Sequence, residues 1–216
     1  MNSPFSAWKT GAPYYLPPLL LGLVSLPFTS GTSLVYVSAG VLAIGAFVLF
    51  FFRDPPRRLP SDPKAIVSPA DGTIVAIEEL SESPHYPGPC TCVSIFLSVF
   101  SVHVNRAPYE CEVRDLRYAK GRYMNAMKAE SSRVNESNAV WLDTPVGPMT
   151  VRQISGAIAR RIVCIPRIGD KLAKGQKIGM IKFGSRTELY LPPDMKIETK
   201  LKAGVRAGTT IIARIS

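Results

Sequence analysis

Side chains that could do chemistry are scarce in this sequence. Its two histidines, His85 and His103, stand apart, and no C-x-x-C thiol pair accompanies them. A catalytic zinc site is therefore hard to assemble, which argues against a metallopeptidase, and we expect no metal ion. No P-loop, G-x-G-x-x-G or G-x-S-x-G motif occurs, so common nucleotide-binding and serine-hydrolase signatures are missing too.

Three short phrases still carry groups that could bind or react. Asp71 lies in Ala-Asp-Gly, which is also a good turn sequence. His103 lies in an apolar strand pattern, where a histidine is more often a core residue than a catalyst. Arg106 could hold a carboxylate or phosphate with its forked donors, or face solvent. Gly184-Ser185 separates two alternating apolar runs, a pattern that by itself predicts a two-residue β-hairpin turn.

The elements that would position these groups are mostly strands. Short β-branched runs, broken by Gly, Pro, Asn and Asp, follow one another from Ile66 onward, as in a β-sandwich or barrel. Only Tyr123–Arg133 has a helical pattern, and a weak one. The predicted strands are Gly72–Glu78, Thr91–Phe96, Glu112–Ala119, Ala139–Thr144, Thr150–Ile158, Ile178–Phe183, Thr187–Leu191 and Thr210–Ile215.

A weak internal repeat narrows the fold. Leu172–Ile178 and Val205–Ile211 share one pattern, in which a glycine-bearing turn leads into a strand that starts with isoleucine. This phrase resembles the turn-and-strand unit of barrel-sandwich hybrid domains, the fold of lipoyl and biotinyl carriers, and Ser68–Ile74 is similar to a strand entry of that fold. We therefore expect a mostly β, barrel-sandwich-hybrid-like domain.

The charges of the chain are distributed unevenly. There are 26 Lys and Arg residues against 16 Asp and Glu among 216 residues, yet none of them lies between Thr10 and Phe52. Within this run, segments of about 14–29 and 33–52 are apolar, and the second is long enough to cross a bilayer. We predict an N-terminal transmembrane or membrane-embedded helical hairpin over residues 1–52, in preference to a cleaved signal peptide.

Residues 53–216 form the second predicted domain, which carries a net charge of 25 − 16 = +9. Arg53, Arg57 and Arg58 follow the apolar run, so the positive-inside rule puts this domain on the cytoplasmic side of the cell (inner) membrane. The four cysteines form no disulfide framework, which favours a reducing compartment. Beside a membrane segment, the positive charge favours anionic lipid over nucleic acid as a partner.

One segment resembles a known family. Lys182–Pro192, with Gly184-Ser185 inside it, closely resembles the self-cleavage segment of the short bacterial and archaeal phosphatidylserine decarboxylases. The other matching stretches occur in the family's order and spacing, so that the likeness covers residues 52–216. They are Phe52–Pro55, Val67–Gly72, Ile95–Pro108, Gln153–Cys164 and Asn135–Asn138, the last with Ser137 in place of the family's arginine.

The resemblance implies a chemistry that needs neither pyridoxal phosphate nor a metal. The Ser185 hydroxyl would attack the Gly184 carbonyl, and the resulting ester would eliminate to leave a pyruvoyl group on residue 185. The β chain (1–184) and the α chain (185–216) would form a heterodimer, with any further oligomerisation open. The pyruvoyl ketone would form a Schiff base with the serine amine of the lipid, whose decarboxylation gives phosphatidylethanolamine.

The resemblance also implies roles for the other candidates. Asp71 matches an aspartate that longer family members pair with a histidine to activate the serine. This chain departs from their His-x-x-His-x-Pro phrase, because it reads His103-Val-Asn-Arg106-Ala-Pro. His103 then corresponds to the histidine of substrate handling and proton transfer, whereas Arg106 cannot act as a base because guanidinium stays protonated. Either His103 serves both steps or Asp71 acts without its partner.

Three other functions stay open at this point. Archaetidylserine has the same headgroup as phosphatidylserine and would suit the same mechanism. A noncatalytic membrane-tethered carrier or adaptor of the hybrid fold would need a modifiable lysine at its hairpin tip, where this chain has Phe-Gly-Ser-Arg. A nucleic-acid binder ranks last, because aromatic residues do not alternate with the basic clusters.

Overall fold

A computed structural model describes residues 6–128, 130–157, 161–182 and 184–215 of the chain. Its contacts divide the described chain into two units, a helical one over Ser6–Pro55 and a β-rich one from Pro56 onward.

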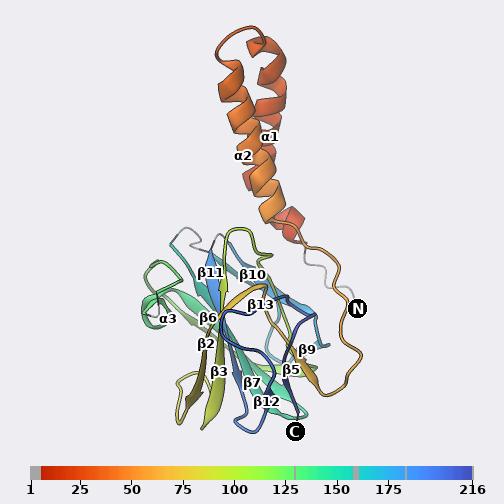
Figure 1. Ribbon diagram of the computed structural model, residues 1–216, viewed down its shortest axis with the longest axis vertical. Coiled ribbons are helices and arrows are strands. Elements are labelled where there is room, and N and C mark those ends of the chain that lie inside the picture. Colours follow the sequence, from red (N-terminus) through yellow and green to blue (C-terminus); the bar gives the residue numbers. More distant parts are fainter. Residues whose placement is uncertain (1–5, 129, 158–160, 183, 216) are drawn as a thin grey trace. The chain divides into compact units, whose positions relative to one another are not determined.

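The helical unit is an antiparallel pair formed by α1 (Ala7–Thr29) and α2 (Val35–Phe51), joined by a short turn (Figure 1). Two glycines let the helices approach closely. A Cβ atom on Gly22 would lie 2.8 Å from the backbone of Leu42, and one on Gly45 would lie 2.8 Å from the backbone nitrogen of Leu19. Because both spaces are too small for a side chain, the glycines determine how tightly the two helices pack.

The expected helical hairpin is present, with 23 residues in α1, four of them prolines, and 17 residues in α2. The prediction that its segments span a membrane is not supported. Across the described residues, no helix combines the length and the apolarity that a membrane crossing requires.

The β-rich unit is built around an antiparallel eight-stranded sheet with the order β13-β2-β3-β11-β7-β6-β5-β9 (Figure 1). Strand β11 lies near its middle and pairs with β3 on one side and β7 on the other. The strands are β2 (Gly72–Leu80), β3 (Cys90–Leu97), β5 (Cys111–Ala119), β6 (Ser137–Thr144), β7 (Gly147–Ser155), β9 (Lys171–Leu172), β11 (Ser185–Leu191) and β13 (Gly204–Val205).

Two three-stranded sheets complete the unit, with the orders β1-β14-β12 and β4-β10-β8. Apolar side chains of all three sheets, such as Ile66, Ile178, Leu189 and Ile212, share one core. The small sheets therefore pack on a single face of the large one. Their strands are β1 (Ala65–Val67), β4 (Val104–Arg106), β8 (Ile162–Cys164), β10 (Lys177–Ile181), β12 (Lys196–Ile197) and β14 (Ile211–Arg214).

The mostly β prediction is confirmed, and each of the eight predicted strands has a counterpart in the structure. The predicted ends at Ile158 and Phe183 lie outside the described residues. The likeness to barrel-sandwich hybrids stays a prediction. The helix predicted over Tyr123–Arg133 is wrong, because among the described residues of this region only Ser131–Val134, named α3, is helical. The preceding loop instead directs backbone groups to the side chains of Asn135 and Arg186.

The two copies of the internal repeat form similar turns. Gly175 and Gly208 both have left-handed backbone angles, with φ of 75° and 71°, and each turn leads into a strand. Both turns lie near the side chains of Leu59 and Arg106. Cβ atoms added to the two glycines would both contact Leu59, and the Gly175 carbonyl accepts a hydrogen bond from Arg106. The repeat is therefore a real structural feature of the domain.

Candidate active site

The Gly184-Ser185 dipeptide lies where the chain passes from one sheet to another. Strand β10, before it, pairs with β4 and β8, whereas β11, after it, pairs with β3 and β7. The predicted hairpin turn is therefore wrong, because its two strands do not pair with each other. Gly184 makes the crossing with a φ of 70°, a conformation that favours glycine. Without a hairpin tip, the carrier alternative loses its attachment point.

Ser185 is the first residue of β11 and is held by strands on both sides. It pairs with Leu97 of β3 and with Ser155 of β7, and its exposed fraction is 0%. The side-chain oxygen is buried and has no hydrogen-bond partner among the described residues. A buried hydroxyl without a partner is costly in a folded protein and calls for an explanation. Here the hydroxyl belongs to the residue directly after Gly184, whose carbonyl it would attack.

His103 contacts the same dipeptide from the position just before β4. Its Nε2 atom accepts a hydrogen bond from the Gly184 N–H at 3.2 Å, and its Nδ1 atom lies 2.9 Å from the Ser101 carbonyl oxygen. A carbonyl can only accept, so Nδ1 carries the proton and donates, while Nε2 offers its lone pair to the Gly184 N–H. This arrangement requires the neutral ring. The structure thus brings His103, Gly184 and Ser185 together.

A series of hydrogen bonds between buried side-chain amides links the small sheet that contains β4 to the large sheet. Asn105, two residues after His103, donates from Nδ2 to Thr187 Oγ1 at 3.0 Å, and Thr187 lies two residues after Ser185. Gln153 of β7 donates to Asn105 Oδ1 at 2.9 Å and accepts from Asn138 at 3.4 Å. His103 lies two residues before Asn105, and Ser185 lies two residues before Thr187 on the same face of β11, so this contact also brings His103 close to Ser185.

Asp71 and Arg106 bind the repeat turns instead. Asp71 accepts from Arg57 at 2.9 Å and from the backbone N–H of Ala207 at 2.8 Å. Arg106 donates to the Gly175 carbonyl at 3.1 Å. Through these contacts both side chains hold the turns, and none of the contacts involves Ser185.

The sequence analysis did not identify Asn105, Gln153 and Thr187 as site residues. One sequence signal could have found them, which is a polar residue at alternate positions of an otherwise apolar strand.

The opposite face of the large sheet carries charged groups. Arg186, Glu188 and Tyr190 alternate with the core-facing residues of β11 and line a cavity of about 830 Å³. Within it, Arg152 and Glu188 form a buried ion pair at 3.2 Å. Burial, together with the charges of Arg152 and Arg117, lowers the pKa of His85, another lining residue, to about 4. Neither Ser185 nor His103 lines this cavity.

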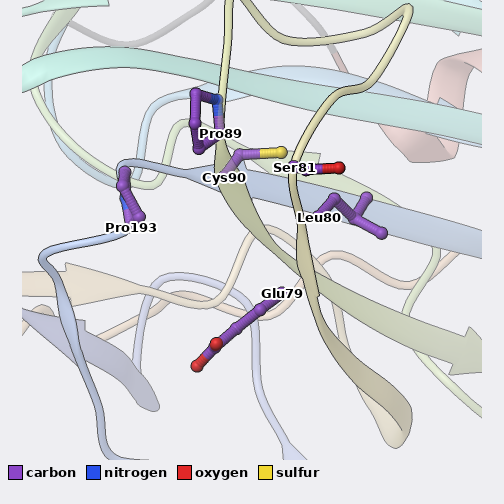
Figure 2. A pocket seen from close by; sticks show the side chains of 6 residues that line it. All are labelled: Glu79, Leu80, Ser81, Pro89, Cys90 and Pro193. Atoms are coloured by element: carbon purple, nitrogen blue, oxygen red, sulfur yellow. The ribbon is translucent and has the colours of Figure 1, made fainter.

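A smaller cavity of about 300 Å³ lies at the far end of the same strands (Figure 2). Its lining includes Leu80, Cys90 and Pro193, at the ends of β2, β3 and β11. The partner of Ser185 on β3 is Leu97, seven residues from Cys90 and therefore roughly 23 Å away along the strand. This cavity is therefore remote from the Ser185 site.

Over the described residues, no three His, Cys, Asp or Glu side chains gather into a metal-binding group.

Comparison with known proteins places this sequence in a family. The sequence profile described as phosphatidylserine decarboxylase matches residues 44–213. The chain belongs to this family. It is 48% identical over 177 residues to the phosphatidylserine decarboxylase proenzyme of Carboxydothermus hydrogenoformans, covering 81% of this chain and 83% of that protein. To the proenzyme of Nitrosomonas europaea it is 41% identical over 212 residues, covering 93% and 97% of the two chains.

The family membership agrees with the recognised motifs. The matched region contains the whole Lys182–Pro192 segment as well as His103 and Asp71. The word proenzyme in the names of both relatives describes proteins that are processed after synthesis. In this chain, the Gly184-Ser185 crossing combines a left-handed glycine, a buried hydroxyl and a contacting imidazole.

Proposed function

We propose that this chain is the precursor of a phosphatidylserine decarboxylase, which cleaves itself between Gly184 and Ser185 and then converts phosphatidylserine to phosphatidylethanolamine and carbon dioxide. The observation that carries the proposal is the buried Ser185 hydroxyl, which has no hydrogen-bond partner among the described residues. It adjoins the carbonyl of Gly184, and the N–H of that same residue is bound by His103. A pyruvoyl group fits this position, because it would arise from Ser185, the one serine among the described residues whose buried hydroxyl has no hydrogen-bond partner.

Self-cleavage begins with an exchange of bonds within the dipeptide. The Ser185 Oγ–Gly184 carbon bond forms, the Gly184–Ser185 amide bond breaks, and the hydroxyl proton passes to the freed amine. Loss of the Ser185 Cα proton then breaks the Cβ–O bond and releases Gly184 as a carboxylate. Water adds to the dehydroalanine and ammonia leaves, which creates the pyruvoyl group at the start of the α chain.

Burial of Ser185 serves this sequence of steps. Water that reached the ester would hydrolyse it and leave an ordinary serine at the new amino terminus, so the site must exclude water until elimination is complete. The exposed fraction of Ser185 is 0%, and strands on both sides enclose it. The same enclosure accounts for a nucleophile that has no hydrogen-bond partner, because any strong partner would hold the hydroxyl away from the carbonyl.

In the mature enzyme, His103 is the group that we assign to proton transfer. The pyruvoyl group supplies an electron sink for the decarboxylation. Cleavage frees the Gly184 N–H from β11, so Nε2 of His103 becomes available beside residue 185. Its lone pair and its position suit a group that takes up and returns protons there, while Nδ1 remains oriented by Ser101. Asp71 and Arg106 act indirectly, through the turns that they hold.

The lipid tails are not specified by this site. Diacyl phosphatidylserine and the ether lipid archaetidylserine present the same serine headgroup to residue 185, so archaetidylserine is the alternative substrate. Curated relatives named phosphatidylserine decarboxylase proenzyme favour the diacyl lipid. An assay of carbon dioxide release with each lipid in matched vesicles distinguishes the two, and a strong preference for the ether lipid would overturn our assignment.

We also propose that the helical unit holds the enzyme at the cell (inner) membrane, with the β-rich unit on the cytoplasmic side. Its helices expose large apolar side chains, including Leu21, Val24 and Phe28 at 62%, 62% and 84%, which can enter the interfacial layer of a bilayer. The four free cysteines of the β-rich unit suit a reducing compartment. Sedimentation with anionic vesicles tests this, since Val24→Asp should weaken binding and Thr32→Asp, in the turn, should not.

Mass analysis under denaturing conditions tests the proposed function most directly. The wild-type protein should give two chains that separate at Gly184/Ser185, with the smaller one lighter by the mass of ammonia than a chain beginning with serine. Ser185→Ala should stay a single chain, and Ser81→Ala, an exposed control, should be processed normally. A single intact wild-type chain with full decarboxylase activity would refute the mechanism.

A further inference from the structure

Gly156 lies directly against the carbonyl group that the proposed self-cleavage attacks. It follows β7, and a Cβ atom added to it would overlap the Gly184 carbonyl oxygen and lie 2.9 Å from the Gly184 carbonyl carbon. Gly156 is buried and has no left-handed backbone angle, so its lack of a side chain is required by space alone. The scissile carbonyl therefore occupies a space that only a glycine at position 156 leaves open.

The backbone before Gly156 is held on two sides. The Ser155 carbonyl accepts from Asn135 Nδ2 at 2.8 Å, and the Ser155 N–H donates to the Glu136 carbonyl at 2.9 Å. The same Asn135 side chain also binds both backbone groups of Met124, at 2.9 and 2.8 Å. Asn135 therefore joins the end of β7 to the loop that begins at Met124.

That loop returns to Gly156, where Arg186 fixes it. Arg186 follows Ser185 on β11 but projects to the opposite face of the sheet, where Nε donates to the Ala126 carbonyl at 3.2 Å. Its Nη2 atom donates to the carbonyls of Met127 and Lys128 at 3.4 and 3.5 Å. The methyl group of Ala126 then lies 3.5 Å from the position of a Gly156 Cβ. Arg186 is 5% exposed, so its charge is used inside the protein.

From these contacts we propose that Gly156 and Arg186 are positioning residues for self-cleavage, an inference that rests on the proposed function. Gly156 provides the space in which the scissile carbonyl lies, and Arg186 clamps the 126–128 loop that closes this space from the other side. His103 holds the N–H of Gly184, so both ends of that residue are fixed. Rotation of the Ser185 side chain is then the main movement that the attack requires.

The geometry sets the expected size of the effect. Nonbonded carbon and oxygen atoms approach to about 3.3 Å, so Gly156→Ala must push the carbonyl away by about 1 Å. A displacement of this size costs on the order of 100-fold in rate when two groups must meet in a fixed geometry. Arg186→Met leaves the carbonyl in place but releases the loop, so we expect about a 10-fold slower cleavage, with Arg186→Lys intermediate between Arg186→Met and the wild type.

The experiment follows the conversion of freshly translated full-length chain into two chains by denaturing mass analysis. Gly204→Ala is the matched glycine control, since no atom lies within 4 Å of its added Cβ, and Arg114→Met is the control for an exposed arginine. Both controls should cleave within about twofold of the wild type. Added hydroxylamine, which cleaves esters, should not rescue Gly156→Ala, because the ester does not form.

A second readout separates positioning from general loss of structure. A loosened loop should admit water, so the small chain of Arg186→Met should partly begin with serine rather than pyruvoyl, while the variant still unfolds in one cooperative thermal transition. Cleavage of Gly156→Ala and Arg186→Met at control rates would overturn the inference. If Gly156→Ala does not fold, the two Arg186 variants decide alone. An uncleaved wild-type chain would instead count against the proposed function.

Discussion

Asn105 joins the two sheets that must meet at the active site, and its removal should weaken both the fold and self-cleavage. The side chain is fully buried, donates to Thr187 Oγ1 at 3.0 Å and accepts from Gln153 Nε2 at 2.9 Å. Asn105→Ala removes both contacts at once and leaves two buried polar groups without their main partner. We therefore expect a loss of stability together with a slower reaction.

The magnitude follows from the number of orphaned groups. A buried donor or acceptor without a partner costs about 1–3 kcal/mol, so two of them cost about 2–6 kcal/mol. The lower half of this range is expected, because Gln153 keeps a longer contact of 3.5 Å to the Val163 carbonyl and the Thr187 hydroxyl can rotate. Self-cleavage should slow by at least about 10-fold, since the same contact brings His103 close to Ser185.

Urea unfolding measures the first effect best in the uncleavable Ser185→Ala chain, where every variant is a single polypeptide. A second substitution, Thr187→Val, should cost about 1 kcal/mol less in the Asn105→Ala chain than alone, because its partner is already gone. Thr73→Val, at an exposed position of β2, serves as the matched control. A cost below about 1 kcal/mol with an unchanged cleavage rate would contradict the role that we give Asn105.

Two further predictions concern charged groups. Asp71→Asn should destabilise the proenzyme by about 3 kcal/mol in urea unfolding, because it leaves the buried Arg57 without a counter-charge; a loss below about 1 kcal/mol would show that the pair is not structural. The pKa of His85 is lowered from 6.5 to about 4, so the unfolded chain takes up this proton first, and stability should fall as the pH drops from about 6.5 to 4. His85→Gln should reduce the fall in melting temperature between about pH 7 and pH 5, and an equal fall in both proteins would refute this assignment.

The long strands could be predicted from the sequence because their pattern of β-branched residues is strong. Strands such as β4 and β8 could not, since three residues are too few to show an alternating pattern. The Gly184-Ser185 pair illustrates the limit. Its local sequence fits a hairpin turn, but β10 and β11 belong to different sheets, and that choice depends on core packing of residues far apart in the chain.

The site was partly predictable for similar reasons. Ser185 and His103 were identified by family resemblance, and their contact through Gly184 is a finding of the structure. Asp71 lies in a recognisable motif, yet its partner Arg57 comes from the segment between α2 and β1, and no sequence pattern connects the two residues. Gly156 gave no usable signal, because the need for a glycine arises from a carbonyl on a separate strand.

Because Ser185 starts a central strand, the proposed cleavage would leave the α chain inside the β-sheets of the protein. Residues after the proposed cleavage point supply β11 and β13 to the large sheet and β12 and β14 to a small one, so the α chain would stay paired with the rest of the fold after cleavage. Under the proposed self-cleavage, the pyruvoyl group would form only in a chain whose sheets have paired correctly. The same strand pairings would then hold the α chain, and the group it carries, in the protein.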